Sequence, residues 1–164
     1  MKLILVGLDG AGKTAILYTL KWNFPLTTGL TSTLGYNVEE VSFNGIAFEM
    51  WDLGGEHQTR AIWRQYFKDT QGIIFVVDSS CRERFSEAKE EIERLMKYEA
   101  LQALPLCTMA HKQDLPGALS PEEVTQLLSL TDIRDRKWTA IPSSVTASGS
   151  TGLQEALQWF SALS

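Results

Sequence analysis

The segment that most constrains how this chain can fold is Gly7-Leu-Asp-Gly-Ala-Gly-Lys-Thr14. It fits the pattern G-x-x-x-x-G-K-[ST], follows a short apolar run typical of a buried strand, and precedes apolar residues at helical spacing. Because glycines lack a Cβ, successive backbone N–H groups can curve around phosphate oxygens at the positive end of the following helix. We therefore predict a phosphate-binding loop; the alternative is a glycine-rich turn that happens to precede Lys-Thr. The residues expected to bind phosphate groups are Asp9, Gly10, Ala11, Gly12, Lys13 and Thr14.

Further polar positions complete a predicted site for a nucleotide and Mg²⁺. Lys13 would reach the β- and γ-phosphates, and the Thr14 hydroxyl would ligate the ion. In Asp52-Leu-Gly-Gly55, which ends a predicted strand, Asp52 can hold Mg²⁺ through a water and the Gly55 N–H can meet the γ-phosphate. Thr33, in a polar loop, can offer its hydroxyl to the same ion. Each residue alone has an ordinary explanation, but their order along the chain favours Thr14, Thr33 and Asp52 as metal ligands.

The composition is that of one globular domain. The chain has 164 residues, of which 44% are apolar and 21% charged, and we expect a single domain over residues 1–164. Its 15 basic and 20 acidic residues give a net charge of −5, which argues against nucleic-acid binding because that requires a basic face. Apolar runs stay far below the ~20 residues of a membrane span. Cys81 and Cys107 lie outside metal-ligand spacings, so we expect reduced thiols and a cytoplasmic location.

Strand-like and helix-like segments alternate along the chain. Strands are predicted over residues 3–6, 37–43, 46–52, 72–78, 104–110 and 138–145, and helices over 13–22, 85–96, 121–128 and from 153 to 160. Asn44-Gly45, between two of these strands, is typical of a tight hairpin. Ser120, directly before Pro121, is the expected N-cap of its helix. The alternation predicts an α/β domain with a mostly parallel sheet, to which the hairpin adds one antiparallel strand.

Two stretches indicate which base the nucleotide carries. His111-Lys-Gln-Asp114 follows a buried strand, and the Asp114 carboxylate offers two acceptors that match the N1–H and N2–H₂ donors of guanine, which adenine lacks. Lys112 would lay its aliphatic stem along the base. Thr146-Ala147 belongs to a loop whose backbone N–H is expected to face the guanine O6. The alternative for Asp114 is a solvated acidic residue in a loop.

The chain resembles the Arf and Arf-like family of small GTPases over nearly its whole length. The resemblance rests on Gly7-Leu-Asp-Gly-Ala-Gly-Lys-Thr14, Gly35-Tyr-Asn-Val38, Trp51-Asp-Leu-Gly-Gly55, Trp63-Arg-Gln-Tyr66-Phe67, Phe75-Val-Val-Asp-Ser79, Lys112-Gln-Asp-Leu-Pro116, and Gly152-Leu153 leading into Leu157-Gln-Trp159. It implies a P-loop GTPase fold with a six-stranded, mostly parallel sheet flanked by helices, and a GDP/GTP cycle. It also implies a guanine-exchange factor, a GAP and effector proteins as partners. In this family an aromatic trio matching Tyr36, Trp51 and Tyr66 lines the effector surface; core packing is the alternative for each ring.

The chain departs from the family pattern at three positions. Glu56 stands at the catalytic position, where most members have a Gln that orients the attacking water. Since an ionised carboxylate is repelled by the γ-phosphate, we expect slow hydrolysis. His111 replaces the usual Asn, which predicts weaker nucleotide binding and faster exchange. Ser32 replaces a Pro before Thr33, which predicts a more mobile switch loop.

The resemblance also bears on location and partners. Family members usually carry an amphipathic N-terminal helix, often myristoylated, ahead of the first strand, and residues 1–6 show no counterpart. We expect either a trimmed chain or a protein without that anchor, so that the full-length protein is peripheral to membranes and this stretch alone does not bind them stably. The loop between Lys21 and Thr33, together with Ser79-Ser80, is similar to the ciliary Arf-like branch, which recruits a coat complex. We expect a monomer.

Three functions compete on this reading. The first is a regulatory switch that recruits effectors in membrane trafficking when GTP is bound. The second is a GTP-binding module with negligible turnover, which Glu56 and His111 favour. The third, a P-loop kinase or ATPase, would leave Asp114 and the Asn-Gly hairpin unexplained.

Overall fold

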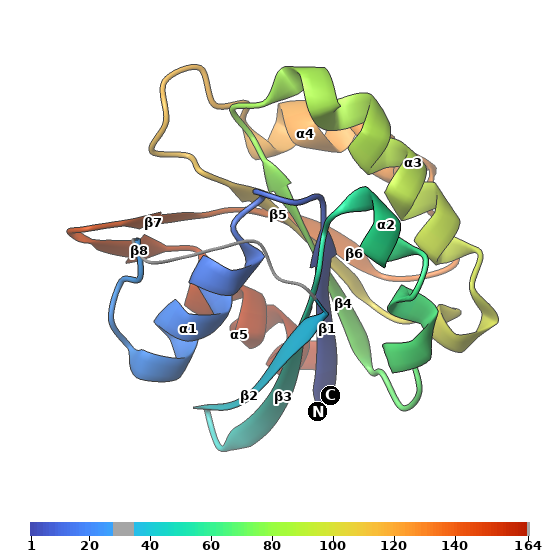
Figure 1. The fold of residues 1–164 in the computed structure, drawn as a ribbon, viewed down its shortest axis with the longest axis horizontal. Coiled ribbons are helices and arrows are strands. Elements are labelled where there is room, and N and C mark those ends of the chain that lie inside the picture. Colours follow the sequence, from blue (N-terminus) through green and yellow to red (C-terminus); the bar gives the residue numbers. More distant parts are fainter. Residues whose placement is uncertain (28–34, 164) are drawn as a thin grey trace.

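The computed structural model describes residues 1–27 and 35–163, which are built around a six-stranded sheet in the order β2-β3-β1-β4-β5-β6 (Figure 1). The strands are β1 (Lys2–Gly7), β2 (Tyr36–Phe43), β3 (Ile46–Leu53), β4 (Gly72–Asp78), β5 (Leu106–His111) and β6 (Trp138–Pro142). Neighbouring strands are parallel except for β2, which pairs antiparallel with β3. The mostly parallel sheet with one antiparallel strand is confirmed.

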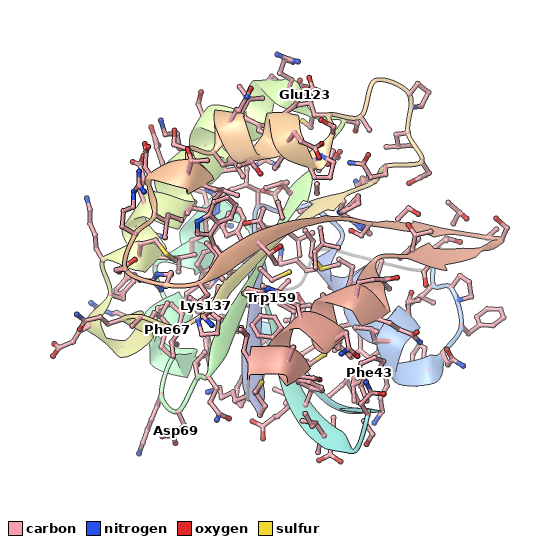
Figure 2. The ribbon with its side chains drawn as sticks, turned by 180° about the vertical axis from the view of Figure 1, so that it is seen from behind. Phe43, Phe67, Asp69, Glu123, Lys137 and Trp159 are labelled. Atoms are coloured by element: carbon pink, nitrogen blue, oxygen red, sulfur yellow. The ribbon has the colours of Figure 1, made fainter. Side chains whose placement is uncertain are left out.

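Helices cover both faces of the sheet. They are α1 (Lys13–Trp22), α2 (His57–Arg60), α3 (Phe85–Met96), α4 (Pro121–Leu127) and α5 (Leu153–Leu163), and short 3₁₀ helices lie at Trp63–Tyr66, Arg82–Arg84, Glu99–Leu101 and Leu130–Asp132. Helices α1 and α5 pack on one face, whereas α2, α3 and α4 lie on the other (Figure 1). Figure 2, the view from behind, shows side chains filling the space between the sheet and the helices on its two faces.

Strand β1 shows why its short apolar run is continuous. Ile4 and Val6 pack toward α3 and α4, while Leu3 and Leu5 pack toward α1 and α5, and all four side chains are fully buried. Because successive side chains of a strand point to opposite faces, a strand covered on both sides needs apolar residues at every position. The continuous apolar run of β1 therefore indicates a strand in the middle of three layers, with helices on both faces of the sheet.

Local signals for the turn and the cap are confirmed. Asn44 and Gly45 have φ angles of 50° and 77°, as the tight turn between β2 and β3 requires. The Ser120 hydroxyl accepts a hydrogen bond from the Glu123 N–H (3.2 Å), and the Glu123 side chain accepts one from the Ser120 N–H (3.1 Å). This reciprocal capping box fixes the start of α4.

Two predicted strands are wrong in their bounds. Strand β5 begins at Leu106 rather than at residue 104, because the Leu104 N–H donates to the Leu101 carbonyl within a turn and Pro105 has no N–H. The predicted strand over 138–145 is two strands, since β6 ends at Pro142 and β7 (Ser144–Thr146) pairs antiparallel with β8 (Gly149–Thr151). The stretch interpreted as a base-binding loop is thus largely a second hairpin.

The sheet topology brings the predicted site residues to one edge. Strands β1, β3, β4 and β5 run in the same direction, so their carboxyl ends meet. The chain passes from β1 to β3 on one side and then to β4 on the other, and such a switch point is where open α/β sheets bind ligands. Within the two described ranges, no helix has the length and apolar character needed to span a bilayer.

Candidate functional site

A cleft of about 490 Å³ lies at the carboxyl ends of β1, β3 and β5. The segments that follow these strands form most of its wall, and residues just after α1 close one side. Its lining residues are Asp9, Gly10, Gly12, Lys13, Thr14, Ala15, Leu26, Thr27, Gly55, Glu56, His111, Lys112, Asp114, Leu115 and Val145. The fold therefore gathers most of the predicted site residues around one volume, although they come from distant parts of the chain.

The phosphate-binding loop packs tightly against the segment after β3. The Asp9 N–H donates to the Gly55 carbonyl (3.1 Å). A Cβ on Gly55 would lie 2.5 Å from the Asp9 nitrogen and 2.6 Å from the Gly7 oxygen, so only glycine allows this approach. A movement of Gly55 is therefore passed directly to the loop.

Lys13 lies inside this loop with only 6% of its surface exposed. Its ammonium donates to the carbonyls of Gly7 (3.3 Å) and Leu8 (3.2 Å). Burial lowers the pKa of Lys13 to about 8, although the nearby carboxylates of Asp52 and Asp9 act in the opposite direction. An anionic group in the cleft would favour the charged form of this lysine.

Two predicted metal ligands are in direct contact. The Thr14 hydroxyl donates to Asp52 Oδ2 (2.6 Å), and the Asn37 amide donates to the same oxygen (3.0 Å). Mg²⁺ prefers oxygen ligands and binds through one or two protein groups together with substrate phosphates, so this hydroxyl and carboxylate fit the ion. The third predicted ligand, Thr33, lies outside the described residues.

The opposite end of the cleft carries the predicted base-binding residues. Lys112 has a φ angle of 64°, and its ammonium contacts the Gly10 carbonyl (2.8 Å) and Asp78 Oδ2 (3.1 Å). This contact ties the segment after β5 to the phosphate-binding loop. Asp114 is exposed and borders the cleft, where its carboxylate can accept hydrogen bonds from a ligand.

His111 borders the cleft, and its side chain packs beneath the phosphate-binding loop. The residue is 3% exposed, and its Nδ1 is 2.7 Å from the Ser143 hydroxyl. Burial, with a smaller contribution from the Lys112 ammonium, lowers the pKa of His111 to about 4. The imidazole is therefore neutral near pH 7.

Three predicted cofactor-binding residues do not line the cleft. Ala11 is buried, and its N–H donates to the Leu8 carbonyl (3.3 Å). Thr146 ends β7 and Ala147 lies in the turn of the β7–β8 hairpin, whereas Val145 borders the cleft. Because Thr146 and Ala147 belong to this hairpin and are not among the lining residues, their expected contact with the base stays a prediction.

Glu56, at the predicted catalytic position, borders the cleft and accepts a hydrogen bond from the Gln58 amide (3.0 Å). Four residues after Glu56, the side chain of Arg60 is buried, with 2% of the residue exposed. Arg60 donates to the Gly55 carbonyl (2.8 Å) and pairs with Glu87 (2.6 Å) and Glu91 (3.4 Å) of α3.

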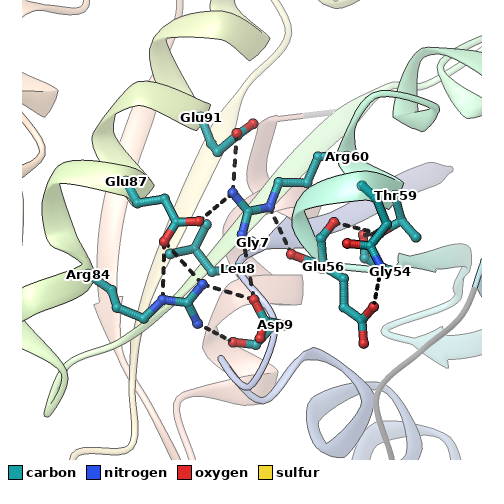
Figure 3. A network of polar contacts seen from close by, with 12 residues as sticks. Gly7, Leu8, Asp9, Gly54, Glu56, Thr59, Arg60, Arg84, Glu87 and Glu91 are labelled. Carbon is teal, nitrogen blue, oxygen red and sulfur yellow. Dashed lines mark hydrogen bonds and ion pairs between the residues drawn. The ribbon is translucent and has the colours of Figure 1, made fainter.

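A second arginine joins this network to the phosphate-binding loop (Figure 3). Arg84 contacts Asp9 (2.9 Å) and Glu87 (3.1 Å), while Arg60 lies 3.5 Å from the same Asp9 oxygen. The hydrogen bond from Arg84 is the main reason that the pKa of Asp9 is lowered. The network thus connects α2, α3 and the loop electrostatically.

Motifs and residue spacing did not predict a role for Arg60, Arg84, Ser143 or Asn37. The partners of the arginines lie as far as 75 residues away, and short-range spacing carries no signal of such contacts. Asn37 belongs to the Gly35-Tyr-Asn-Val38 motif, so the position was recognised although its bond to Asp52 was not.

The predicted aromatic trio forms one cluster on the surface. Ring centroids are separated by 5.1 Å between Tyr36 and Trp51, 5.0 Å between Tyr36 and Tyr66, and 5.9 Å between Trp51 and Tyr66. Tyr36 is 50% exposed. The Lys2 ammonium lies 4.5 Å from the Trp51 ring centre.

Comparison with known proteins agrees with this architecture. A family model described as the ADP-ribosylation factor family, Arf, matches residues 1–163. Among solved structures, the chain is similar to the Arl6 BBS3 small GTPase from Trypanosoma brucei with the bound nucleotide analogue GppNp. The two are 31% identical with a TM-score of 0.88, and the match covers 99% of this chain and 96% of that one. The chain belongs to the ADP-ribosylation factor family of small GTPases.

Proposed function

We propose that this protein is a guanine-nucleotide switch that binds GDP and GTP with Mg²⁺. The observation that carries the proposal is the single cleft that has Lys13 and the phosphate-binding loop at one end and Asp114 at the other. The similarity to a small GTPase with bound GppNp supports it. A net charge of −5 means that local groups, rather than a general basic surface, must hold the phosphates.

Each end of the cleft has a distinct task in this proposal. The Lys13 ammonium and the backbone N–H groups of the loop neutralise the phosphate oxygens. When bound, Mg²⁺ would be held by Thr14, Asp52 and Thr33 and would neutralise charge on the β- and γ-phosphates. The Asp114 carboxylate accepts from the two donors on guanine, and the Lys112 stem packs along the base.

The switch itself follows from the contacts of Gly55. A γ-phosphate that draws the Gly55 N–H toward it also moves the carbonyl that accepts from Asp9 and Arg60. The segment from Glu56 onward then changes its position relative to α3, and an effector can read the change at the nearby aromatic cluster of Tyr36, Trp51 and Tyr66.

The family implies regulators and effectors as partners. We further propose that the GTP form recruits effectors in membrane trafficking, that an exchange factor and a GAP set its lifetime, and that the full-length protein is monomeric, cytoplasmic and peripheral to membranes. The loop between Lys21 and Thr33 together with Ser79-Ser80 supports a relation to the ciliary Arf-like branch.

Equilibrium binding of fluorescent GDP, GTP and ATP tests the base assignment. We expect GDP and GTP to bind much more tightly than ATP, and equal binding of ATP and GTP would overturn it. Asp114→Asn replaces two acceptors by one acceptor and one donor, which matches xanthine, where an oxygen replaces the guanine amino group. The variant should lose GDP and gain xanthosine diphosphate, whereas Asp132→Asn, at an exposed position outside the cleft lining, should behave as the parent.

A second candidate function, a binding module with negligible turnover, is favoured by Glu56. Glu56 borders the cleft, and ionised carboxylate oxygens there would repel both the γ-phosphate and the developing transition-state charge. We expect single-turnover hydrolysis at or below the ~10⁻⁴ s⁻¹ of unassisted small GTPases.

Comparison of Glu56→Gln with the parent, with and without cell extract as a GAP source, separates the two functions. A faster Glu56→Gln variant supports the role of Glu56, and an unchanged or slower one contradicts it. Stimulation of the parent by extract favours the switch, and its absence favours the binding module.

A further inference from the structure

Aromatic and acidic side chains share one face of the β2–β3 hairpin. Because facing residues of an antiparallel pair point to the same side of a sheet, Val38 shares this face with Trp51. Two residues further from the phosphate-binding loop on each strand, Glu40 and Glu49 face each other on the same side. Tyr36 and both glutamates are exposed. This face, called the hairpin face below, therefore has an aromatic end and an acidic end.

The indole of Trp51 joins the two ends of the hairpin face. Its Nε1–H donates to Glu49 Oε1 (2.6 Å). Its ring is stacked on that of Tyr36, with the ring centroids 5.1 Å apart and 26° between the planes. The hydrogen bond fixes the carboxylate of Glu49 at the edge of the indole, so a partner that pairs with this carboxylate does not have to order it first.

The two glutamates do not stabilise the free chain. Like charges that lie directly opposite in a sheet are destabilising. In the part of the chain that the structure describes, the ion pairs include neither Glu40 nor Glu49. The cation beside this pair in the sheet is Lys2, whose ammonium instead donates to the carbonyls of Tyr66 and Lys68 (2.7 Å each). Two facing negative charges become favourable when a cation of a partner lies between them.

We propose that the hairpin face binds a protein segment that carries an apolar side chain and an arginine. The apolar side chain packs on the rings of Tyr36 and Trp51, and the guanidinium lies between Glu40 and Glu49. A planar guanidinium can donate to two carboxylates and stack on an aromatic ring, so it complements this face better than an ammonium does. The inference rests on the proposed function, because it defines the kind of effector that the switch recruits.

Selection from a display library of short random peptides tests the proposal. The full chain, in buffer with GppNp and Mg²⁺, and its Glu40→Gln/Glu49→Gln double variant are used in parallel. Peptides are compared only if Tyr36→Ala weakens their binding, which places them on the hairpin face. We expect the parent to select an apolar residue together with arginine, and the double variant to select the apolar residue alone. Peptides without a basic residue, equal enrichment of arginine by both proteins, or a library without such binders would overturn the proposal.

The affinity of a selected, fluorescently labelled peptide isolates the contribution of each charge. Glutamine at position 49 keeps an oxygen that can accept from the indole and removes only the charge. Glu40→Gln and Glu49→Gln should each weaken binding about 3- to 10-fold in fluorescence polarisation. Replacing the arginine of the peptide by alanine should remove the difference between the parent and both variants. A difference that persists with the alanine peptide, or an affinity that neither substitution changes, would contradict the pairing.

A matched control adjoins Glu40 in the same strand. Glu39 points to the other side of β2, where it pairs with Lys21 (3.9 Å). Glu39→Gln removes the same formal charge and should leave the peptide affinity unchanged, whereas an equal loss would show that only the overall charge matters. In the free chain, Glu40→Gln should keep or slightly raise the midpoint of urea unfolding, because it removes a repulsion. A lowered midpoint would show that this glutamate serves folding and would count against a binding role.

Fluorescent GDP binding to the same preparation separates this proposal from the proposed function. If arginine peptides bind and depend on both glutamates while GDP does not bind, the proposed function fails and the interaction surface stands. If GDP binds and the selected peptides lack a basic residue, only the assignment of the hairpin face fails.

Discussion

Acidification should destabilise this protein through His111 more than through an ordinary surface histidine. The pKa of His111 is about 4 in the folded chain, lowered from 6.5 mainly by burial. Between these two values the unfolded chain binds a proton that the folded chain does not. The stability that comes from the neutral, buried ring is therefore fully present above pH 6.5 and is lost as the pH falls toward 4.

The size of the effect follows from the two pKa values. At pH 5 the linkage relation gives a loss of about 2 kcal/mol relative to pH 7 for this one group. Urea unfolding at pH 7, 6 and 5, followed by tryptophan fluorescence, measures it in the parent and in His111→Asn, which has no titrating ring. With both proteins in the same nucleotide state, other titrating groups contribute equally to the two curves.

The decisive quantity is the difference in unfolding free energy between the parent and His111→Asn at each pH. Between pH 7 and pH 5, we expect the unfolding free energy of the parent to fall by about 2 kcal/mol relative to that of His111→Asn. A difference that stays constant within about 0.5 kcal/mol, the usual scatter of additive effects, would refute the assignment of a buried neutral imidazole.

Three further outcomes follow from the described contacts. Arg60→Met removes a buried cation from Glu87 and the buried Glu91, which keep Arg84 and Arg94 as partners, and should cost about 2 kcal/mol of unfolding free energy in urea titrations. Arg82→Met, at a surface pair of 3.9 Å, should change the unfolding free energy little. Gly55→Ala forces a Cβ to 2.5 Å from the Asp9 nitrogen and should speed GDP release in stopped-flow fluorescence; unaltered release would contradict the tight contact. Tyr36→Ala removes a half-exposed ring, so calorimetry should find a small change in Tm, and a large loss would identify the ring as core.

Local features of the fold could be predicted from the sequence because their causes are local. The Asn44-Gly45 turn needs two positive φ angles, and the Ser120 cap needs a hydroxyl three residues before a glutamate. The β7–β8 hairpin was missed because strands of three residues show too little alternation to be detected. The four-residue helix α2 was missed because one helical turn is too short to show a helical spacing of apolar residues.

In the candidate site, too, features of short motifs could be predicted and contacts between distant residues could not. The phosphate-binding loop, Asp52 and Asp114 could be predicted because each belongs to a short motif with its own chemistry. The position of His111 was predicted, but its partner was not, since Ser143 lies 32 residues further along the chain.

By itself, the sequence determined the backbone conformations and the chemical groups at each strand end, because glycines, turn pairs and caps act over a few residues. Only the tertiary structure decided which of those groups meet. The contact of Thr14 with Asp52 spans 38 residues, and that of Arg60 with Glu91 spans 31. Such contacts depend on the order of strands in the sheet and on helix packing across it, and no short stretch of sequence contains that information.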